Sequence, residues 1–262
     1  MAGAITDSGL AAVNQTISAL FKKGLSDGQN LPWNLLATDL GKSSAATRAF
    51  DWFGGIGEVH ERTKEGQHFG GFRRHNWTIE HKEYGIGMLL RVRDIATDQL
   101  QQIPGLVAQA AAKMATHPGR LLFDALEANP TAADGAALFA NTHTYGAAAN
   151  WDNLLAGTGV TTSAFEADLA SAQETMFLAQ DDNGEVLELP LDTIAIPPAM
   201  QLTVEKVLGP LRQVGGTDSQ LGNIAKLGGV FQAGGLTVIV NGRATDRNNW
   251  YFFYTKGEVK PF

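Results

Sequence analysis

The chain has 262 residues, of which 44% are apolar, so it is long enough to bury a core in one large domain or two lobes. Its net charge of -7 argues against a partner held mainly by phosphate neutralisation, and the absence of cysteine excludes disulfides, thiolate catalysis and cysteine-ligated zinc. The first residues lack the basic leader and apolar run of a signal peptide, and no stretch reaches the about 20 apolar residues of a membrane span. We therefore expect no membrane partner, and a reducing cytoplasm is compatible with the composition.

The N-terminal part of the chain predicts one helix followed by an extended arm. Apolar residues recur at helical spacing between residues 10 and 24, and Gly24 is expected to end this helix. Residues 29–55 mix Pro, Ser, Thr and Gly with isolated large apolar side chains, which is typical of an extended segment that lies on another surface. The apolar side chains for which we expect burial against other subunits are Leu31, Trp33, Leu35 and Phe50.

The middle of the chain predicts a β ribbon and a long helix. Between Asp51 and Arg91, aromatic and β-branched residues alternate with charged ones, which indicates a long hairpin or looped ribbon. From Asp94 to about residue 128 the composition turns to Ala, Gln and Leu with one apolar face, which predicts a long helix. Pro104 and Pro118 fit the first turn of a helix or a kink, because proline lacks the N–H that the helix interior uses.

The last hundred residues predict alternating helices and short strands. A capping box at Ser163 and Glu166 predicts the start of a second amphipathic helix. After a turn at residues 182–184, a buried strand is expected at Thr193 to Ile196, followed by a helix that opens with Pro197 and Pro198. The glycine-punctuated closing stretch predicts two or three further strands.

We find no constellation of residues that predicts catalysis, metal binding or cofactor binding. His60, His68, His75 and His81 all lie in the expected ribbon, but their spacing matches no metal-ligand motif such as H-E-x-x-H. The hydroxyl-rich stretches "THTYG" and "SSAAT" lack the G-x-S-x-G or S-x-x-K context of a nucleophile. The paired glycines near the end do not form a phosphate-binding G-x-G-x-x-G motif. We therefore expect no enzyme.

Charged residues of both signs crowd the stretch "HERTKEGQHFGGFRRHN", residues 60–76. Arg73 and Arg74 between two aromatic residues resemble a base-stacking surface, but neighbouring glutamates nearly balance the charge. A mixed-sign arm that forms ion pairs with another protein is the better interpretation. The residues that we expect in this intersubunit contact are Glu58, Glu61, Arg62, Lys64, Glu65, Arg73 and Arg74.

The order of these segments resembles the major head subunit, or major capsid protein, of Mu-like phages. The similarity runs from about residue 13 to the end. The stretches that carry it are "FDWFGGIGEVHERTKEG", "EYGIGMLLRVRDI", "HPGRLLFDALEAN", "LELPLDTIAIPPAMQLTVEKVL" and "LTVIVNGRATDRNNWYFFYTKGEVKPF". Relatives continue beyond the "KPF" stretch, so we expect further residues after it.

The resemblance implies an α+β fold of the Hong Kong 97 type. It implies an N-terminal arm at 1–49, an extended loop at 50–91, a peripheral domain with a spine helix at 92–160, an axial domain at 161–240, and closing strands of the peripheral domain at 241–262. These boundaries are expectations that rest on the resemblance alone.

The resemblance also implies a function and partners. The subunit is expected to self-assemble as hexamers and pentamers into an icosahedral shell around double-stranded DNA, without sequence-specific binding and without a cofactor. The implied partners are further copies of the chain, a separate scaffolding protein, a portal and a decoration protein. The implied location is the virion, after assembly in the host cytoplasm.

Two other functions compete with this interpretation. The first is an encapsulin-like shell protein of the same fold, which forms a cellular compartment around a cargo enzyme. The second is a soluble α/β enzyme with its site in the glycine-rich residues 214–235, which the missing nucleophile, metal ligands and phosphate loop argue against.

Overall fold

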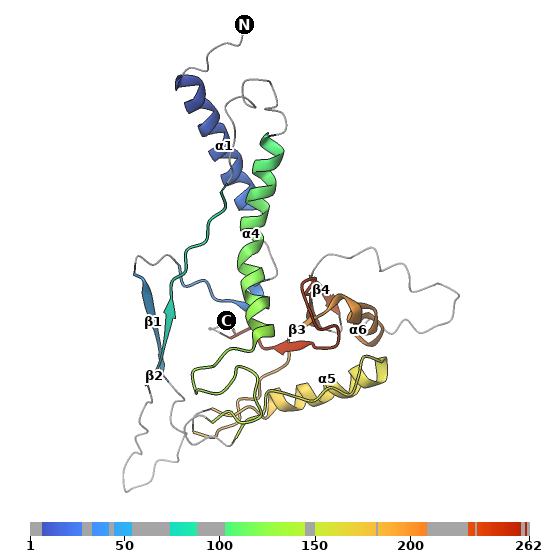
Figure 1. Ribbon diagram of the computed structural model, residues 1–262. Helices are drawn as coiled ribbons and strands as arrows, with labels where there is room; N and C mark the ends of the chain where they lie inside the picture. The colour runs from blue at the N-terminus through green and yellow to red at the C-terminus, as the bar shows by residue number, and fades with distance from the viewer. Residues whose placement is uncertain are drawn as a thin grey trace, which may run out of the picture. The chain divides into compact units, whose positions relative to one another are not determined.

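The computed structural model describes residues 7–27, 33–41, 45–53, 74–87, 103–144, 150–181, 183–208, 230–233, 235–257 and 260. The chain divides into two compact units. The first unit comprises Met1–Asn34 and Lys82–Leu122, and the second comprises Leu35–His81 and Phe123–Phe262. Helices and sheets are both present (Figure 1), which confirms the expected mixed class.

The first unit is built on a pair of packed helices, α1 (Asp7–Asp27) and the larger part of α4 (Ile103–Ala128). The predicted N-terminal helix is confirmed, but its predicted end at Gly24 is wrong, because α1 continues to Asp27. A Cβ atom at Gly24 would lie only 2.7 Å from the Cβ of the buried Ala111 in α4. The glycine therefore lets the two helices approach closely, and it does not stop α1.

Helix α4 confirms the predicted long helix from Ile103 onward, while residues 94–102 of that prediction lie outside the described residues. Pro104 falls in its first turn and Pro118 in its interior. The segment 81–87 lies beside this helix, since the Tyr84 ring packs edge-on against the His117 ring at 4.4 Å.

The second unit contains a two-stranded ribbon and a separate four-stranded sheet. Strands β1 (Thr47–Phe53) and β2 (Arg74–Glu80) pair antiparallel, which confirms the predicted ribbon. The residues that connect them, 54–73, lie outside the described part of the chain. The register places Phe50 opposite Trp77 and Arg48 opposite Ile79.

The four-stranded sheet has the order β4, β5, β3, β6. These strands are Val230–Ala233, Leu236–Val240, Thr193–Ile196 and Tyr251–Phe253. Strand β3 has the predicted bounds and runs parallel to β5 but antiparallel to β6. Its alternate residues point to opposite faces and all four are buried, so both faces of the sheet are covered at β3.

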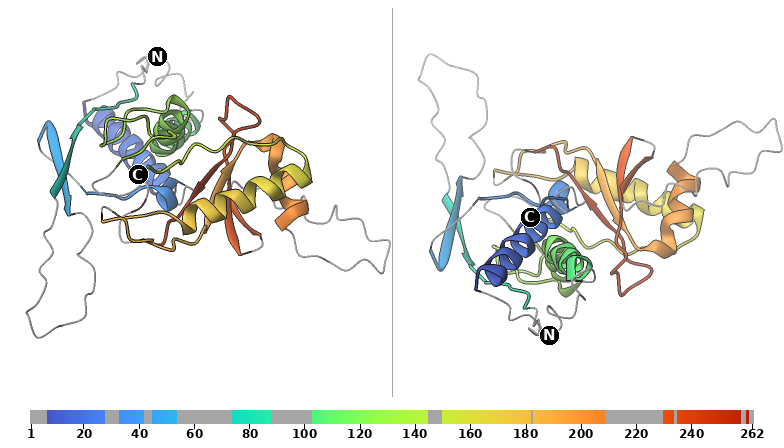
Figure 2. Two further views of the ribbon diagram at one scale, coloured as in Figure 1. Left: turned by 90° about the horizontal axis from the view of Figure 1, so that it is seen from below. Right: turned by 90° about the horizontal axis from the view of Figure 1, so that it is seen from above.

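Helices α5 (Thr162–Phe177) and α6 (Gln201–Leu208) pack with this sheet, and Figure 2 shows α5 running across the strands. A 3-10 turn at Pro198–Met200 leads into α6, as the double proline predicted. The core that these elements share consists of Phe165, Leu191, Ile194, Ile196, Met200, Val204 and Val238.

The predicted N-terminal cap of α5 is wrong. Ser163 already lies inside the helix, and the extended residue Thr161 is the cap, its hydroxyl oxygen accepting the Ala164 N–H at 3.3 Å. Thr161 and Ser163 are both hydroxyl residues at the N-terminal end of α5. The error therefore moves the cap by two residues and leaves the helix itself as expected.

Three carboxylates of the second unit each accept hydrogen bonds from the backbone N–H and the hydroxyl of one threonine, at 2.6 to 3.0 Å. The pairs are Glu127 with Thr245, Asp168 with Thr158, and Asp192 with Thr255. Two of the pairs fix a loop to a helix, and the Asp192 pair fixes the segment after β6 to the start of β3. Charged acceptors make these hydrogen bonds stronger than neutral ones.

Candidate assembly surfaces

The ribbon of β1 and β2 presents an apolar face that the described residues leave largely uncovered. Trp77 and Ile79 alternate on one face of β2 and are 40% and 45% exposed. Phe50, the predicted arm contact opposite Trp77, is half-buried. A two-stranded ribbon is marginally stable by itself in water, so an apolar face of this kind is a candidate contact for another protein surface.

The opposite face of the ribbon carries an ion pair. Arg74, which the sequence placed in an intersubunit contact, donates to Asp51 of its own chain at 2.6 Å. The pair is well exposed, so it contributes about 0 to 1 kcal/mol. The other charged residues of that predicted contact lie outside the described residues: Glu58, Glu61, Arg62, Lys64, Glu65 and Arg73.

The predicted arm contacts have different environments. Trp33 is half-buried, and a Cβ atom at Gly119 of α4 would lie 3.1 Å from its Cδ1 atom, so this indole packs within its own chain. Its buried Nε1 has no hydrogen-bond partner among the described residues. Leu35 is exposed and Leu31 lies outside the described part of the chain. Sequence alone did not separate the packed side chain from the exposed one.

A groove of about 330 Å³ lies in the first unit between α1, α4 and segment 81–87. Its lining is mainly apolar and consists of Ile17, Ser18, Phe21, Lys22, Ile86, Val107 and Ala110. The polar groups in it are one hydroxyl and one ammonium, without a carboxylate or imidazole to act as a base. This groove therefore offers no acid–base pair for catalysis.

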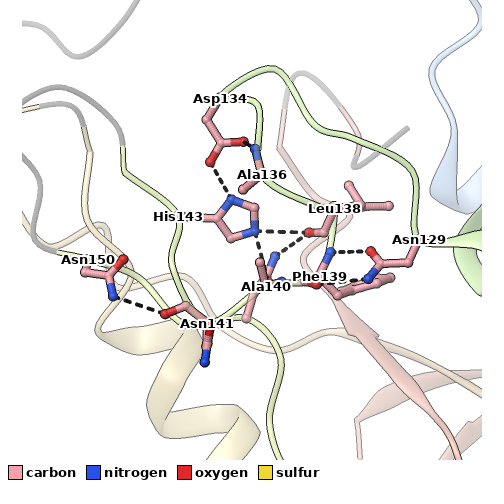
Figure 3. Close-up of polar contacts among 10 residues, drawn as sticks. Asn129, Asp134, Ala136, Leu138, Phe139, Ala140, Asn141, His143 and Asn150 are labelled. Carbon is pink, nitrogen blue, oxygen red and sulfur yellow. Dashed lines mark hydrogen bonds and ion pairs between the residues drawn. The ribbon is translucent and has the colours of Figure 1, made fainter.

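In the described part of the second unit, Asp134 and His143 form a buried pair in the loop after α4 (Figure 3), and Asn153 joins them through His143. The Nδ1 atom of His143 lies 2.6 Å from the Asp134 carboxylate, and its Nε2 atom lies 3.1 Å from Asn153 Oδ1 and 3.2 Å from the Leu138 carbonyl oxygen. The amide of Asn153 is oriented by donating to the Leu138 carbonyl and accepting from the Ala140 N–H. The cluster ties together the loop that follows α4.

Each ring nitrogen of His143 therefore faces only acceptors. Nδ1 faces Asp134 and Nε2 faces Asn153 and Leu138, so both ring nitrogens are occupied by contacts inside the protein. Burial alone would raise the pKa of the Asp134 carboxyl, but the hydrogen bonds from His143 and Ala136 and the attraction of the imidazole charge outweigh it and lower this pKa. An Asp–His pair arranged in this way leaves neither ring nitrogen directed at a nucleophile among the described residues.

No pattern in the sequence predicts this cluster. In the stretch "THTYG" the threonines lack the context of a nucleophile, and the histidine is the residue that forms the polar contacts of this loop. The available signal was weak, because Asp134 and His143 are single polar residues in a loop and neither belongs to a spaced motif.

Among the described residues, no group of three or more His, Asp or Glu side chains is arranged to hold a metal ion. His75 and His81 belong to the described ribbon region, while His60 and His68 do not. Within that same part of the chain, every helix is too short or too polar to cross a membrane.

Comparison with known proteins points to a single class. A family described as phage capsid protein matches residues 77–262. The fold is similar to the procapsid of bacteriophage JBD30, with a TM-score of 0.60 and 16% identity over 82% of this chain and 95% of that chain. It is also similar to the capsid of bacteriophage JBD30 decorated with minor capsid protein trimers, with a TM-score of 0.52 and 16% identity over 79% of this chain and 92% of that chain.

No curated protein matches the chain. At 16% identity the two structural similarities show a shared fold and no more. The family match, in contrast, extends over well more than half of the sequence, from within β2 through α4, both packed helices and the whole four-stranded sheet. The chain therefore belongs to the phage capsid protein family.

Proposed function

We propose that this capsid protein is the major head subunit of a Mu-like phage and that it assembles as hexamers and pentamers into an icosahedral shell around double-stranded DNA. The family match and the similarity to a procapsid and a capsid support this proposal. The proposed fold type is that of Hong Kong 97, with the arm, extended loop, spine helix, peripheral and axial domains at the boundaries given by the resemblance. Helix α4 is then the spine helix, and β1 with β2 is the base of the extended loop.

The amphipathic ribbon is the observation that carries the proposal. Trp77 and Ile79 remain exposed on a ribbon too small to be stable alone, and burial against neighbouring copies would remove their apolar surface from water. We expect the intersubunit contacts to exceed about 2,000 Å² per subunit in total, as in obligate assemblies. An exposed apolar surface of this kind is unusual on a protein that stays monomeric.

We propose that the charged tip of the loop, from Glu58 to Arg74, forms ion pairs with an adjacent subunit. Arg74 already pairs with Asp51, but a guanidinium has five N–H donors, so this one contact leaves donors for a second partner. Each exposed pair contributes little, yet a shell repeats the contact at every subunit. The net charge of -7 is compatible with a shell that encloses DNA without binding its phosphates tightly.

The proposed partners are a separate scaffolding protein, a portal and a decoration protein, with assembly in the host cytoplasm and a final location in the virion. The decoration protein is suggested by the JBD30 capsid, which is decorated with minor capsid protein trimers. No catalytic step is part of the proposal, because the groove and the buried Asp–His pair lack the groups for one.

Electron microscopy of the purified protein tests this function, with closed shells or tubes as the expected result. The double variant Trp77→Ser and Ile79→Ser should lose assembly while keeping its circular dichroism spectrum. Asn76→Ser with Thr78→Ser, on the other face of the same strand, is the matched control and should assemble like the parent. A parent that stays monomeric at high concentration in light scattering would contradict the proposal.

A further inference from the structure

The loop after α4 is held largely by side chains. In its described residues, 129–144 and 150–153, the Asn129 amide accepts the Phe139 N–H at 2.7 Å and donates to the Phe139 carbonyl oxygen at 3.0 Å. His143 and Trp151 exchange two backbone hydrogen bonds of 3.0 Å. The buried Asp134–His143 pair joins the early part of the loop to this later part (Figure 3). The pair consists of two titratable groups, so the structure of the loop can depend on protons.

The contact between Asp134 and His143 requires one proton. Nδ1 of the ring lies 2.6 Å from the Asp134 Oδ2 atom, and neither an ionised carboxylate nor a bare ring nitrogen can donate. Whichever of the two atoms holds the proton, the contact is a hydrogen bond only while that proton is present. The side chains of His143 and Asp134 are only 4% and 3% exposed, so little solvent can reach them to replace the contact.

The other ring nitrogen offers no alternative arrangement. Nε2 lies 3.1 Å from Asn153 Oδ1 and 3.2 Å from the Leu138 carbonyl oxygen. The Asn153 amide is fixed in this orientation, because its Oδ1 accepts the Ala140 N–H at 2.7 Å and its Nδ2 donates to the Leu138 carbonyl at 2.8 Å. Once the shared proton is lost, a ring with one remaining N–H must turn a nitrogen lone pair toward either the Asp134 carboxylate or these two oxygen atoms. Either choice breaks a contact that holds the loop.

The groups that surround the imidazole within the described residues leave this contact in control. Asp134 is the charged side chain that touches the ring, whereas Asn153 and the Leu138 carbonyl are neutral. The Trp151 ring, at 6.2 Å between ring centroids, is neutral as well. An unpaired polar group in such a buried place is costly, so loss of the proton favours an open loop.

The loop also contacts the four-stranded sheet. The Phe139 ring packs on the ring of Tyr251 in the edge strand β6, at 5.3 Å between ring centroids. Burial and the charges of Glu127 and Asp246 raise the pKa of Tyr251 above its ordinary value of 10. Its hydroxyl therefore stays neutral below pH 10, and a change of the loop below that pH does not originate at this contact.

We propose that the loop after α4 is a pH-sensitive element, which is closed while Asp134 and His143 share a proton and opens when that proton is lost. The closed loop is the form that binds the proton, so its stability is present at lower pH and is lost as the pH rises. One proton separates the two forms, so the ratio of open to closed loop increases about tenfold per pH unit once the open loop no longer binds it. This inference concerns the single subunit and does not depend on the proposed shell.

Hydrogen exchange of the full chain at pH 5 to 9, corrected for the intrinsic exchange rate at each pH, tests the inference by mass spectrometry. The informative N–H groups are those of Phe139, Ala140, His143 and Trp151, which donate within the closed loop. In the parent, their protection should decrease toward alkaline pH, with a limiting slope of about tenfold per pH unit. The amides of α5 should keep their protection over the same range.

Asp134→Asn is the matched variant. Its amide oxygen can still accept the Ala136 N–H, and its amide N–H can donate to a ring nitrogen that carries no proton, so the contact no longer needs the shared proton. Protection of the loop in this variant should not change with pH. Protection in the parent that is equally independent of pH would overturn the inference, and so would a variant that loses protection as the parent does. If Asp134→Asn does not fold, His143→Gln, which replaces the ring with an amide that does not titrate, is judged by the same criterion.

Discussion

The substitution Gly24→Ala should destabilise the first unit, although alanine is the better helix former. Gly24 lies inside α1 and faces α4 so closely that an added Cβ atom would lie 2.7 Å from the Cβ of Ala111. Ala111 is fully buried, so it has no free space into which it could move. The new methyl group can be accommodated only if the two helices separate.

Two opposing effects set the magnitude. Alanine in a helix interior is favoured over glycine by about 1 kcal/mol. Carbon atoms in contact prefer about 3.5 to 4.0 Å, so α1 would have to move by about 1 Å, and overpacking of this kind costs about 1 to 3 kcal/mol. We therefore expect Gly24→Ala to lower the free energy of unfolding by up to about 2 kcal/mol.

Guanidinium unfolding of the unassembled subunit, followed by circular dichroism at 222 nm, measures this change. Gly105→Ala in α4 is the matched control, because a Cβ atom there meets no other atom within 4 Å, and it should raise stability by up to about 1 kcal/mol. Adding Ala111→Gly to the first variant should restore the contact, so the two changes should not be additive. Equal stabilisation by Gly24→Ala and Gly105→Ala would refute the close approach of α1 and α4.

Three further predictions concern charged and hydroxyl groups. The folded-state pKa of Asp134 lies below its ordinary value of 3.8, so the ionised carboxylate stabilises the fold above about pH 3.8. This contribution is lost as the pH falls through the lowered pKa. Thermal unfolding measured between pH 2 and 6 should show the loss in the parent and not in Asp134→Asn. Thr255→Val keeps the side-chain shape and should cost about 1 kcal/mol in urea unfolding. Asp192→Ala removes the acceptor of both the half-buried Thr255 N–H and the Thr255 hydroxyl, and it should cost about 2 kcal/mol or more; equal costs would contradict the carboxylate's role. Reversing Arg73 and Arg74 to glutamate should leave the circular dichroism spectrum unchanged and impair shell assembly in a salt-dependent way, and a variant that assembles like the parent at every ionic strength would exclude an ionic role of the tip.

The elements that sequence predicted well are those whose signals are local. Strand β3 was bounded correctly because its four residues, three of them β-branched, precede a double proline, which does not continue a central strand and favours the first turn of a helix. Helix α5 and the long helix α4 were recognised from the spacing of their apolar residues. In each case a run of neighbouring residues carries the whole pattern.

The elements that sequence missed depend on residues that meet only after folding. Gly24 looks like a helix stop until Ala111 is known to lie against it. His143 looks like an isolated loop residue until Asp134 and Asn153 are brought to its two ring nitrogens. Tertiary packing overrides local propensity at the first position and creates a polar network at the second.

The candidate assembly surfaces were harder to predict for a related reason. Trp33 and Trp77 are both large apolar residues in segments that sequence describes as extended, and both could serve a core or an interface. The structure packs the first, half-buried, against Gly119 of its own chain and leaves the second exposed opposite Phe50. Hydrophobic burial is non-directional, so composition cannot tell whether an apolar side chain will be covered by its own chain or by another copy. Only after the core of the single subunit is assigned do the remaining exposed apolar residues, such as Trp77 and Ile79 on the ribbon, become candidates for contact with other copies.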